Sequence, residues 1–444
     1  MQNVHLISNF SKEVFNASQK FTNHLPKAHQ GNFRELVRGV LIKGSVYLSD
    51  ISRANSTQNN VHKDVERYSN TLSKIPALDF SQIQINNQIK HYKHEPVLVL
   101  SDGGDFQKPN AKKMENVCRN VDGSNGHKAG KGYPLESIVA YGLESKKLCP
   151  LSMHLFSTQT EDYKSDWFEH KKVFDQLKDF VQSSTQDRII VEDRGCDDEK
   201  RFLYFLEELK CSFVTRIKAG NKSRGVIIKD KDDNEKVFSI QEIARQIKGI
   251  SGAEKKWYNK KSKKKLTSKI AFQKVFLPNR KEIPLYAIFV YSENYPEPLV
   301  VLTDLITENA EDAWKYFFYY KKRWEVENFY RAIKQNFGAE KFLVLDYKKI
   351  QALAFLVMFV FSLIINLKNK AKEFLGLMYL YYKDFCKKEQ RTGNHHLDLI
   401  AFLRTNIPTN DNEYSYRFWS QFVSKNRKKY NKNQLSLLDW RKKW

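Results

Sequence analysis

The sequence YKKRWEVENFYRAIK, from Tyr320 to Lys334, contains neither proline nor glycine and continues a helix-compatible segment upstream. It predicts the middle of a helix that runs from about Asn309 to Phe337. At about 100° per residue, four of its polar side chains share a stripe about 60° wide. These four are Tyr320, Arg323, Glu327 and Lys334. Glu325 falls on the opposite side of the predicted helix.

The stripe combines a carboxylate with two cations and a phenol. Such a set suits a site that binds a metal ion beside a phosphate chain. A solvated helix face with i,i+4 ion pairs explains the same stripe equally well. The stripe alone therefore leaves both interpretations open.

The composition favours a nucleic acid partner. The chain has 444 residues, of which 41% are hydrophobic, and a net charge of +24. It is long enough for roughly two or three domains. A positive excess of this size indicates a polyanion, and nucleic acid before a membrane surface. The five cysteines form no CxxC motif or Cys/His cluster, so we expect neither a zinc site nor disulfides. The start lacks a signal-peptide pattern, and we expect a cytoplasmic protein.

Two aspartates follow short apolar runs. Pro96–Ser101 (PVLVLS) predicts a buried strand that ends in a glycine-rich turn containing Asp102. Arg188–Glu192 (RIIVE) predicts a second buried strand, followed by Asp193. An aspartate just beyond a buried strand lies at the rim of a sheet, where sites form in α/β folds. The alternative is an ordinary turn aspartate before glycine.

The other elements complete an alternating order. We expect a loop over 108–132, strands at 137–143, 150–157 and 212–218, and helices at 167–181 and 197–209. Short alternating runs between Lys218 and Pro298 predict a largely β insertion. Within it, EKKWYNKKSKKK (254–265) predicts a loop with seven lysines. The apolar run 350–367 is of borderline length for a membrane span, and we expect it to be a helix buried inside the protein.

The spacing Y-x2-R-x3-E-x6-K resembles the signature of the DDE transposases of bacterial insertion sequences. It is similar to the group named for this Tyr-Arg-Glu-Lys motif, the "IS four" family, and Trp324 also matches many members. LSDGGDFQKP, with Asp102, Asp105 and Lys108, resembles the first-aspartate segment of that family. EDRG, with Asp193, resembles its second. The resemblance covers roughly residues 96–367.

The resemblance implies an α/β fold: a ribonuclease H-like mixed sheet flanked by helices, with a β-rich insertion and helical N- and C-terminal regions. We expect a helical DNA-binding region at 1–92, in which Arg53, Lys63 and Arg67 lie near the surface of a helix-turn-helix-like module. A small helical bundle without a DNA role is the alternative. The core would occupy 93–218 and 298–370, the insertion 219–297, and a basic helical region 371–444.

The resemblance also implies a set of site residues. Asp102, Asp193 and Glu327 would be the catalytic carboxylates and would bind two Mg²⁺ ions about 4 Å apart, with Mn²⁺ able to substitute. Tyr320, Arg323 and Lys334 would contact phosphates. Further DNA-binding candidates are Lys108 and, in the lysine-rich loop, Trp257, Lys260, Lys261, Lys263 and Lys264, where the aromatic ring could stack on a base. A solvated loop is the alternative for the latter group.

The implied function is a DNA transposase that cleaves transposon ends and joins them to target DNA. Its partners would be double-stranded DNA, in the form of inverted-repeat ends and target, and a second copy of the chain in a synaptic dimer, with no membrane. We expect a bacterial protein of the cytoplasm, associated with the nucleoid. Two alternatives remain: a ribonuclease H-fold nuclease without strand transfer, and a transposase-derived DNA-binding protein without catalysis.

Overall fold

The computed structural model describes residues 14–55, 60–122, 128–182, 184–220, 223–247, 253–259, 264–293 and 297–370. These residues form two compact units. The larger comprises Pro76–Gln335 and Val344–Ser362. The smaller comprises Asn336–Leu343 and the described parts of Met1–Ile75 and Leu363–Trp444. The predicted basic C-terminal region, 371–444, lies outside the described residues.

The smaller unit contains a helical bundle that includes α2 (Lys27–Lys43), α3 (Leu48–Asn55) and α4 (Val61–Leu72). The helix α2 ends at Gly44, which has a left-handed conformation and donates its N–H to the Val40 carbonyl. At Gly39 a Cβ atom would lie only 2.5 Å from the Ile51 side chain. A glycine at this position therefore allows α2 and α3 to pack closely.

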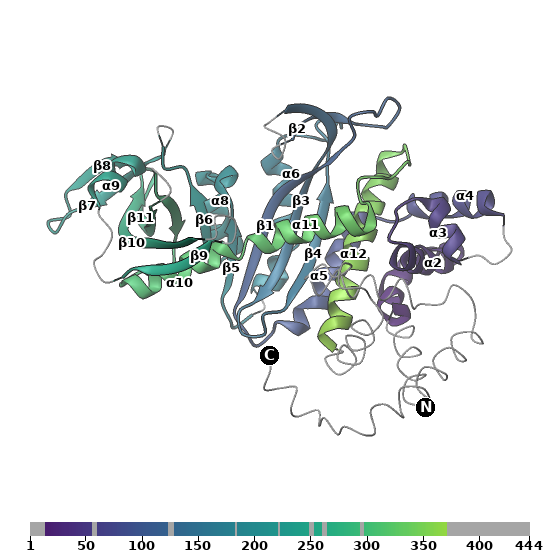
Figure 1. Cartoon of the computed structure of the whole chain (residues 1–444), viewed down its shortest axis with the longest axis horizontal. Helices are drawn as coiled ribbons and strands as arrows, with labels where there is room; N and C mark the ends of the chain where they lie inside the picture. The colour runs from purple at the N-terminus through teal and green to yellow at the C-terminus, as the bar shows by residue number, and fades with distance from the viewer. Residues whose placement is uncertain are drawn as a thin grey trace, which may run out of the picture. The chain divides into compact units, whose positions relative to one another are not determined.

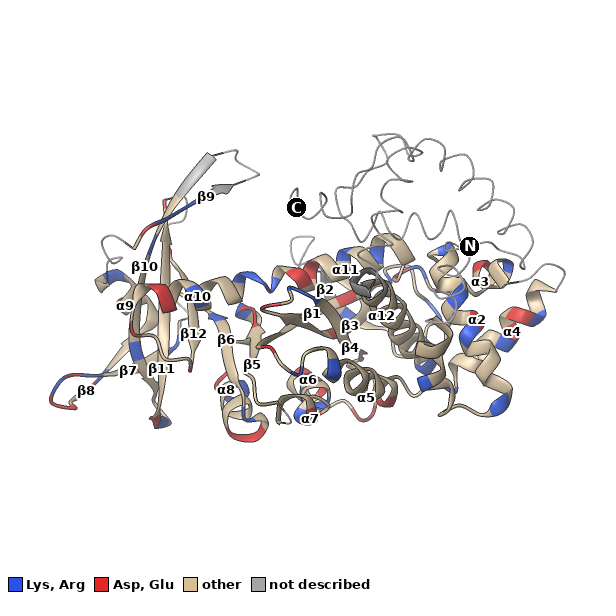
Figure 2. Cartoon of the chain, turned by 90° about the horizontal axis from the view of Figure 1, so that it is seen from below, with Lys and Arg blue, Asp and Glu red and all other residues tan. Residues whose placement is uncertain are grey.

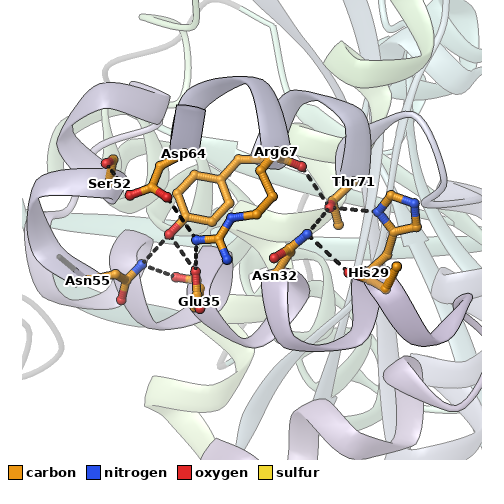
Figure 3. Close-up of polar contacts among 10 residues, drawn as sticks. His29, Asn32, Glu35, Ser52, Asn55, Asp64, Arg67 and Thr71 are labelled. Atoms are coloured by element: carbon orange, nitrogen blue, oxygen red, sulfur yellow. Dashed lines mark hydrogen bonds and ion pairs between the residues drawn. The ribbon is translucent and has the colours of Figure 1, made fainter. Parts of the chain in front are cut away.

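A polar network ties these three helices together (Figure 3). Arg67 of α4 pairs with Glu35 of α2 at 2.7 Å and with Asp64 at 3.0 Å. The Tyr68 hydroxyl donates to Glu35, and Ser52 of α3 donates to Asp64. Arg67 therefore has a structural role in the bundle, although its side chain is partly exposed as the sequence predicted. Arg53 likewise pairs with a carboxylate, that of Asp50.

The larger unit is built on one mixed sheet, with the strand order β4-β3-β1-β5-β6 in its first half (Figure 1). β1 is antiparallel to β3 and parallel to β5, and β5 is parallel to β6. The bounds are β1 Val97–Gln107, β2 Cys118–Asp122, β3 Lys128–Gly142, β4 Leu148–Leu155, β5 Arg188–Glu192 and β6 Ser212–Ile217. This mixed sheet, flanked by helices, confirms the predicted α/β fold class of the ribonuclease H-like kind.

The insertion continues the same sheet. β12 is antiparallel to β6, and β11, β10, β7 and β8 follow in that order. The bounds are β7 Gly225–Lys229, β8 Glu235–Ser239, α9 Ile240–Gln246, β9 Lys255–Asn259, β10 Lys264–Leu277, β11 Arg280–Ser292 and β12 Leu299–Thr303. The described part of residues 219–297 is therefore largely β, as predicted.

Two predicted loops contain strands. The lysine-rich loop includes β9, which pairs with the start of β10, and basic residues mark β9 in Figure 2. The glycine-rich stretch 108–132 includes β2 and the beginning of β3. In both places the cross-strand hydrogen bonds outweigh the low strand propensity of lysine and glycine.

The helices of the larger unit also differ in part from the prediction. Their bounds are α5 Ala77–Gln88, α6 Asp166–Asp175, α7 Lys178–Gln182, α8 Glu199–Leu203, the π-helical η4 Tyr204–Leu209, α10 Ala310–Lys321, α11 Trp324–Phe337 and α12 Tyr347–Lys370. The single helix predicted over 167–181 is divided into α6 and α7. The helix predicted over 309–337 is interrupted at Lys322–Arg323, where backbone N–H groups bond to carbonyls three residues earlier. Arg323, at this break, has tertiary contacts that are described below.

The apolar helix α12 is a core helix. Its segment Tyr347–Asn366 is long and apolar enough to cross a membrane, but 83% of an apolar 18-residue stretch within it is buried inside the protein. Phe355 packs edge-on against Phe80 of α5, and Phe361 packs against Phe329 of α11. Ser362 accepts a hydrogen bond from Gln84. The described part of this helix is therefore buried against protein, as the sequence predicted.

Candidate active site

Sheet register brings the two aspartates to the same level. In the parallel pair of β1 and β5, Leu100 lies opposite Val191. Continuing this register by two residues places Asp102, inside β1, beside Asp193, which directly follows β5. The helix α11 lies over this part of the sheet in Figure 1 and carries Glu327. Three carboxylates far apart in the sequence thus approach one another at the sheet edge.

Arg323 lies at the centre of these carboxylates. Its guanidinium nitrogens are 2.7 Å from Asp102 Oδ2, 2.7 Å from Glu327 Oε1 and 3.8 Å from Asp193 Oδ2. Only 6% of Arg323 is exposed. The break between α10 and α11 falls at this residue. The sequence predicted Arg323 as a phosphate contact, and in the structure it is an ion-pair partner of all three carboxylates.

The other residues of the predicted stripe also contact acidic groups. The Tyr320 hydroxyl donates to Asp193 Oδ1 at 2.9 Å. Lys334 Nζ lies 3.4 Å from Asp105 Oδ1. Glu325 accepts a hydrogen bond from Asn328 within α11. The four residues of the stripe therefore converge on one site, in spite of the break in the helix.

The glycine-rich turn predicted after Ser101 is not present. β1 continues through Gly103 and Gly104 to Gln107, paired along its length with β3. A Cβ atom on Gly104 would lie 2.7 Å from Cζ of Tyr330, whose hydroxyl donates to the Asp102 carbonyl. Glycine is therefore needed here because α11 packs directly on the backbone of β1. Lys108 follows this strand and donates its backbone N–H to the Lys131 carbonyl.

The electrostatics of the site are those of crowded carboxylates. Burial raises the pKa of Asp102 to about 7 against the opposing effect of Arg323, and the carboxylates of Glu136, Asp193 and Glu327 add to the rise. Burial also acts to raise the pKa of Asp193, but Arg323 and hydrogen bonds to its carboxylate outweigh burial and lower it. Burial raises the pKa of the Tyr320 phenol to about 12. Ionised Asp102 is therefore poorly stabilised by Arg323 alone.

The carboxylates fit a divalent metal by their chemistry. Mg²⁺ and Mn²⁺ prefer oxygen ligands, and two or three carboxylates suffice to hold such ions. A cation also stabilises ionised carboxylates that repel each other. Among the described residues, no group of three or more His, Cys, Asp or Glu side chains is arranged to hold a metal ion. In this arrangement Arg323 is the cation that the three carboxylates share.

A buried ionic cluster beneath the site was missed by the sequence reasoning. Arg201 of α8 pairs with Glu192, the last residue of β5, and also donates to His170 Nδ1 at 3.0 Å. Ser101 donates to Glu136 of β3 and contacts Glu192 at 3.5 Å. Ser101 and Glu192 directly precede Asp102 and Asp193. The cluster therefore connects the two strands that carry the aspartates. The available signal was a glutamate at the end of a short buried strand, RIIVE, whose three central residues are apolar.

The protonation of this cluster follows from its contacts. Burial lowers the pKa of His170 to about 4, with a further contribution from the charge of Arg201. Since a guanidinium only donates, His170 Nδ1 accepts. Burial raises the pKa of Glu136, whose Oε2 lies 3.3 Å from the same nitrogen. Burial raises the pKa of Glu192 as well, against the opposing charge of Arg201.

Part of the predicted DNA-binding set cannot be placed. Lys260, Lys261 and Lys263 lie outside the described residues. Trp257 and Lys264 belong to β9 and β10 by their backbones, but their side chains are likewise outside what the structure describes. The site also includes Arg216 of β6, a residue that the sequence did not single out, at 3.8 Å from Asp193.

Comparison with protein families agrees with this fold. The family model of the transposase DDE domain matches residues 93–363, which is more than half of the chain. The matched span contains Asp102, Asp193 and Glu327. A comparison with curated proteins gives no match. Together with the mixed sheet flanked by helices, the match shows that this chain belongs to the DDE transposase family, whose members act on DNA.

Proposed function

We propose that the protein is a metal-dependent DNA transposase of the Tyr-Arg-Glu-Lys group, which cleaves the ends of its element and joins them to target DNA. The observation that carries this proposal is the convergence of Asp102, Asp193 and Glu327 on one guanidinium, inside the span matched by the DDE domain. The spacing of Tyr320, Arg323, Glu327 and Lys334 supports the assignment to the Tyr-Arg-Glu-Lys group.

Asp102, Asp193 and Glu327 are the proposed ligands of two Mg²⁺ ions, for which Mn²⁺ can substitute. When bound, these ions would stabilise both the attacking and the leaving oxygen of an in-line displacement at phosphorus. The contribution of the chain itself is to position these carboxylates. The register of β1 and β5 keeps the two aspartates side by side. The Tyr330 hydroxyl donates to the Asp102 carbonyl and so positions α11, which carries Glu327, against β1. Tyr320, Arg323, Lys334 and Lys108 are the proposed phosphate contacts.

The proposed reaction has two steps. In the first, a water oxygen bonds to phosphorus at the element end and the water loses a proton to solvent. The bond from phosphorus to the 3′ oxygen breaks, and the 3′ oxygen takes up a proton from solvent. In the second, this 3′-OH attacks phosphorus in the opposite strand or in the target and loses its proton, and the displaced 3′ oxygen gains one. Each step exchanges one phosphodiester or water oxygen for another and needs no oxidant or reductant.

The proposed organisation follows the same assignment. Residues 1–92 and the basic region 371–444 are proposed to contact DNA or a second copy of the chain. The insertion at 219–297 is proposed to contact DNA through its lysine-rich hairpin, and the active complex is a synaptic homodimer. The net charge of +24 supports an extensive phosphate-binding surface. Such a protein would act at the bacterial nucleoid, in the cytoplasm.

The proposal is tested on DNA that carries the repeats flanking the gene. Purified protein with Mg²⁺ is expected to nick this DNA and to join its ends to a target plasmid. Glu327→Gln is expected to keep end binding and to abolish nicking, whereas Glu325→Gln, whose side chain bonds to Asn328, is the matched control that cleaves. Equal nicking by Glu327→Gln rejects the metal-ligand role. Cleavage without joining identifies a nuclease, and binding without cleavage identifies an inactive derivative.

A further inference from the structure

We propose that Arg323 exchanges between the site carboxylates and a DNA phosphate, and that this exchange makes divalent-metal binding and DNA binding depend on each other. The inference rests on the proposed function and extends it to regulation of the same site. It arises from an arrangement that the sequence did not predict, since the residues expected to contact phosphates contact carboxylates instead.

Arg323 contacts the carboxylate oxygens of the proposed metal ligands. Its guanidinium lies 2.7 Å from Asp102 Oδ2 and from Glu327 Oε1. The same carboxylates are the ones that a divalent ion requires. A metal ion among them would lie a few ångströms from the guanidinium and would be repelled by it. Full metal binding therefore requires Arg323 to leave this position.

The other residues expected to contact phosphates, Tyr320 and Lys334, also contact carboxylates. The Tyr320 hydroxyl donates to Asp193, and Lys334 lies 3.4 Å from Asp105. Each of these donors can be used by DNA only if its hydrogen bond or ion pair with a carboxylate is given up or shared. The carboxylates and the DNA phosphates therefore compete for the same donors.

Arg323 lies at an interruption between two helices. It lies at the break between α10 and α11, where backbone N–H groups donate to carbonyls three residues earlier. The backbone of Arg323 is therefore not held within a continuous α-helix. Its neighbour Trp324 is 54% exposed, and the Arg323 guanidinium lies 6.0 Å from the Trp324 ring. A cation moving outward can remain against that ring. A phosphate there would accept two parallel N–H bonds from the guanidinium.

Metal binding and DNA binding are therefore reciprocally coupled. When a DNA phosphate binds Arg323, the carboxylates become free to bind metal. When metal binds the carboxylates, Arg323 becomes free to bind DNA. By linkage the two ligands must raise each other's affinity by the same factor. The site would then bind metal mainly when DNA is in place.

The exchange is tested by Mn²⁺ binding, measured by electron paramagnetic resonance on the full chain without DNA. Arg323→Gln is expected to bind Mn²⁺ roughly 5- to 150-fold more tightly than the unmodified protein, a range typical of coupled sites. Arg323→Lys keeps the charge and is expected to stay close to the unmodified protein. Arg216→Gln removes a nearby cation, at 3.8 Å from Asp193, and is expected to have a smaller effect.

Equal Mn²⁺ affinity of Arg323→Gln and the unmodified protein overturns the inference, as does an equal gain in Arg216→Gln, which would indicate only general electrostatics. A second measurement needs no variant. The Mn²⁺ affinity of the unmodified protein is expected to rise when a short mixed-sequence duplex is added, after correction for Mn²⁺ bound to DNA alone. An unchanged affinity also overturns the exchange.

These outcomes are distinct from failure of the proposed function. If the protein cleaves element ends but Arg323→Gln gains no Mn²⁺ affinity, the function stands and the exchange is rejected. If adding Glu327→Gln to the Arg323→Gln protein leaves Mn²⁺ binding unchanged, Glu327 is not a metal ligand, and the proposed function is itself at fault.

Discussion

The ring of Tyr330 lies directly against Gly104, so that a Cβ atom at residue 104 would be 2.7 Å from the Tyr330 Cζ atom. The neighbouring Gly103 differs, because its closest contacts to an added Cβ are ordinary ones, at 3.9 and 4.0 Å. Neither glycine has a positive φ angle. Close approach of α11 to β1, and not backbone conformation, therefore explains the need for glycine at residue 104.

The first prediction follows from this contact. Gly104→Ala is expected to lower the free energy of unfolding by about 1–3 kcal/mol, the usual cost of overpacking. It is also expected to reduce DNA cleavage strongly, because the shift of α11 moves Glu327 away from Asp102. Thermal unfolding and a nicking assay measure the two effects. Gly103→Ala is the matched control and should behave like the unmodified protein; similar losses in both variants would contradict the argument.

The second prediction concerns Lys334. If it contacts a phosphate in the DNA complex, Lys334→Ala should weaken end binding and reduce the slope of log affinity against log salt by about 0.9. Filter binding or fluorescence anisotropy at several salt concentrations measures the slope. Lys178→Ala is the control, because Lys178 pairs with Asp175 outside the site. An unchanged slope in Lys334→Ala would rule out a direct phosphate contact.

The third prediction concerns pH. Burial, with Arg201, lowers the pKa of His170 to about 4, whereas in the unfolded chain its pKa is about 6.5. Between these values the unfolded chain binds the proton and the folded protein does not. This contribution to stability is therefore complete above about pH 6.5 and is lost as pH falls towards 4, by up to about 3 kcal/mol.

His170→Asn keeps an acceptor towards Arg201 but cannot take up a proton at these pH values. Its free energy of unfolding should therefore fall less steeply than that of the unmodified protein between pH 6.5 and 4, and the two slopes should agree above pH 7. Urea unfolding at a series of pH values gives both slopes. Parallel curves throughout the range would show that His170 is not held neutral.

The fourth prediction concerns the pair of Glu192 and Arg201. Both side chains are buried, so Arg201→Met leaves Glu192 without its partner and is expected to cost about 3–5 kcal/mol. Replacing Glu192 as well, by Met, should recover most of this cost, because two apolar groups can replace a buried pair. Unfolding free energies of both single variants and the double variant give the coupling. Additive losses would contradict a direct interaction.

The same double variant separates stability from site geometry. Glu192 directly precedes Asp193, and Ser101, which contacts Glu192, directly precedes Asp102. If the cluster also positions the aspartates, the double variant should regain stability but should cleave DNA more slowly than the unmodified protein. Full recovery of cleavage would give the cluster a purely structural role.

Predictions of features that depend on neighbouring residues were more accurate than predictions of features that depend on distant parts of the chain. The strand Arg188–Glu192 has the predicted bounds, because RIIVE is a short β-branched run between polar residues. The strand expected to end at Ser101 continues to Gln107, since pairing with β3 holds Gly103 and Gly104 in extended conformation. The helix expected to be continuous breaks at Arg323, where the ion pairs are with residues on other elements.

The sequence by itself determined the alternation of strands and helices and the strand content of residues 219–297, and it predicted Asp102, Asp193, Arg323 and Glu327 as site residues. These depend on local periodicity and on motif spacing, which are present in the order of residues. Only the tertiary structure decided that Arg323 joins Asp102, Asp193 and Glu327, and that Arg201 and Glu192 form a buried pair beneath them. Those contacts depend on sheet register and on the loss of solvent around charges, and both arise only when distant parts of the chain pack together.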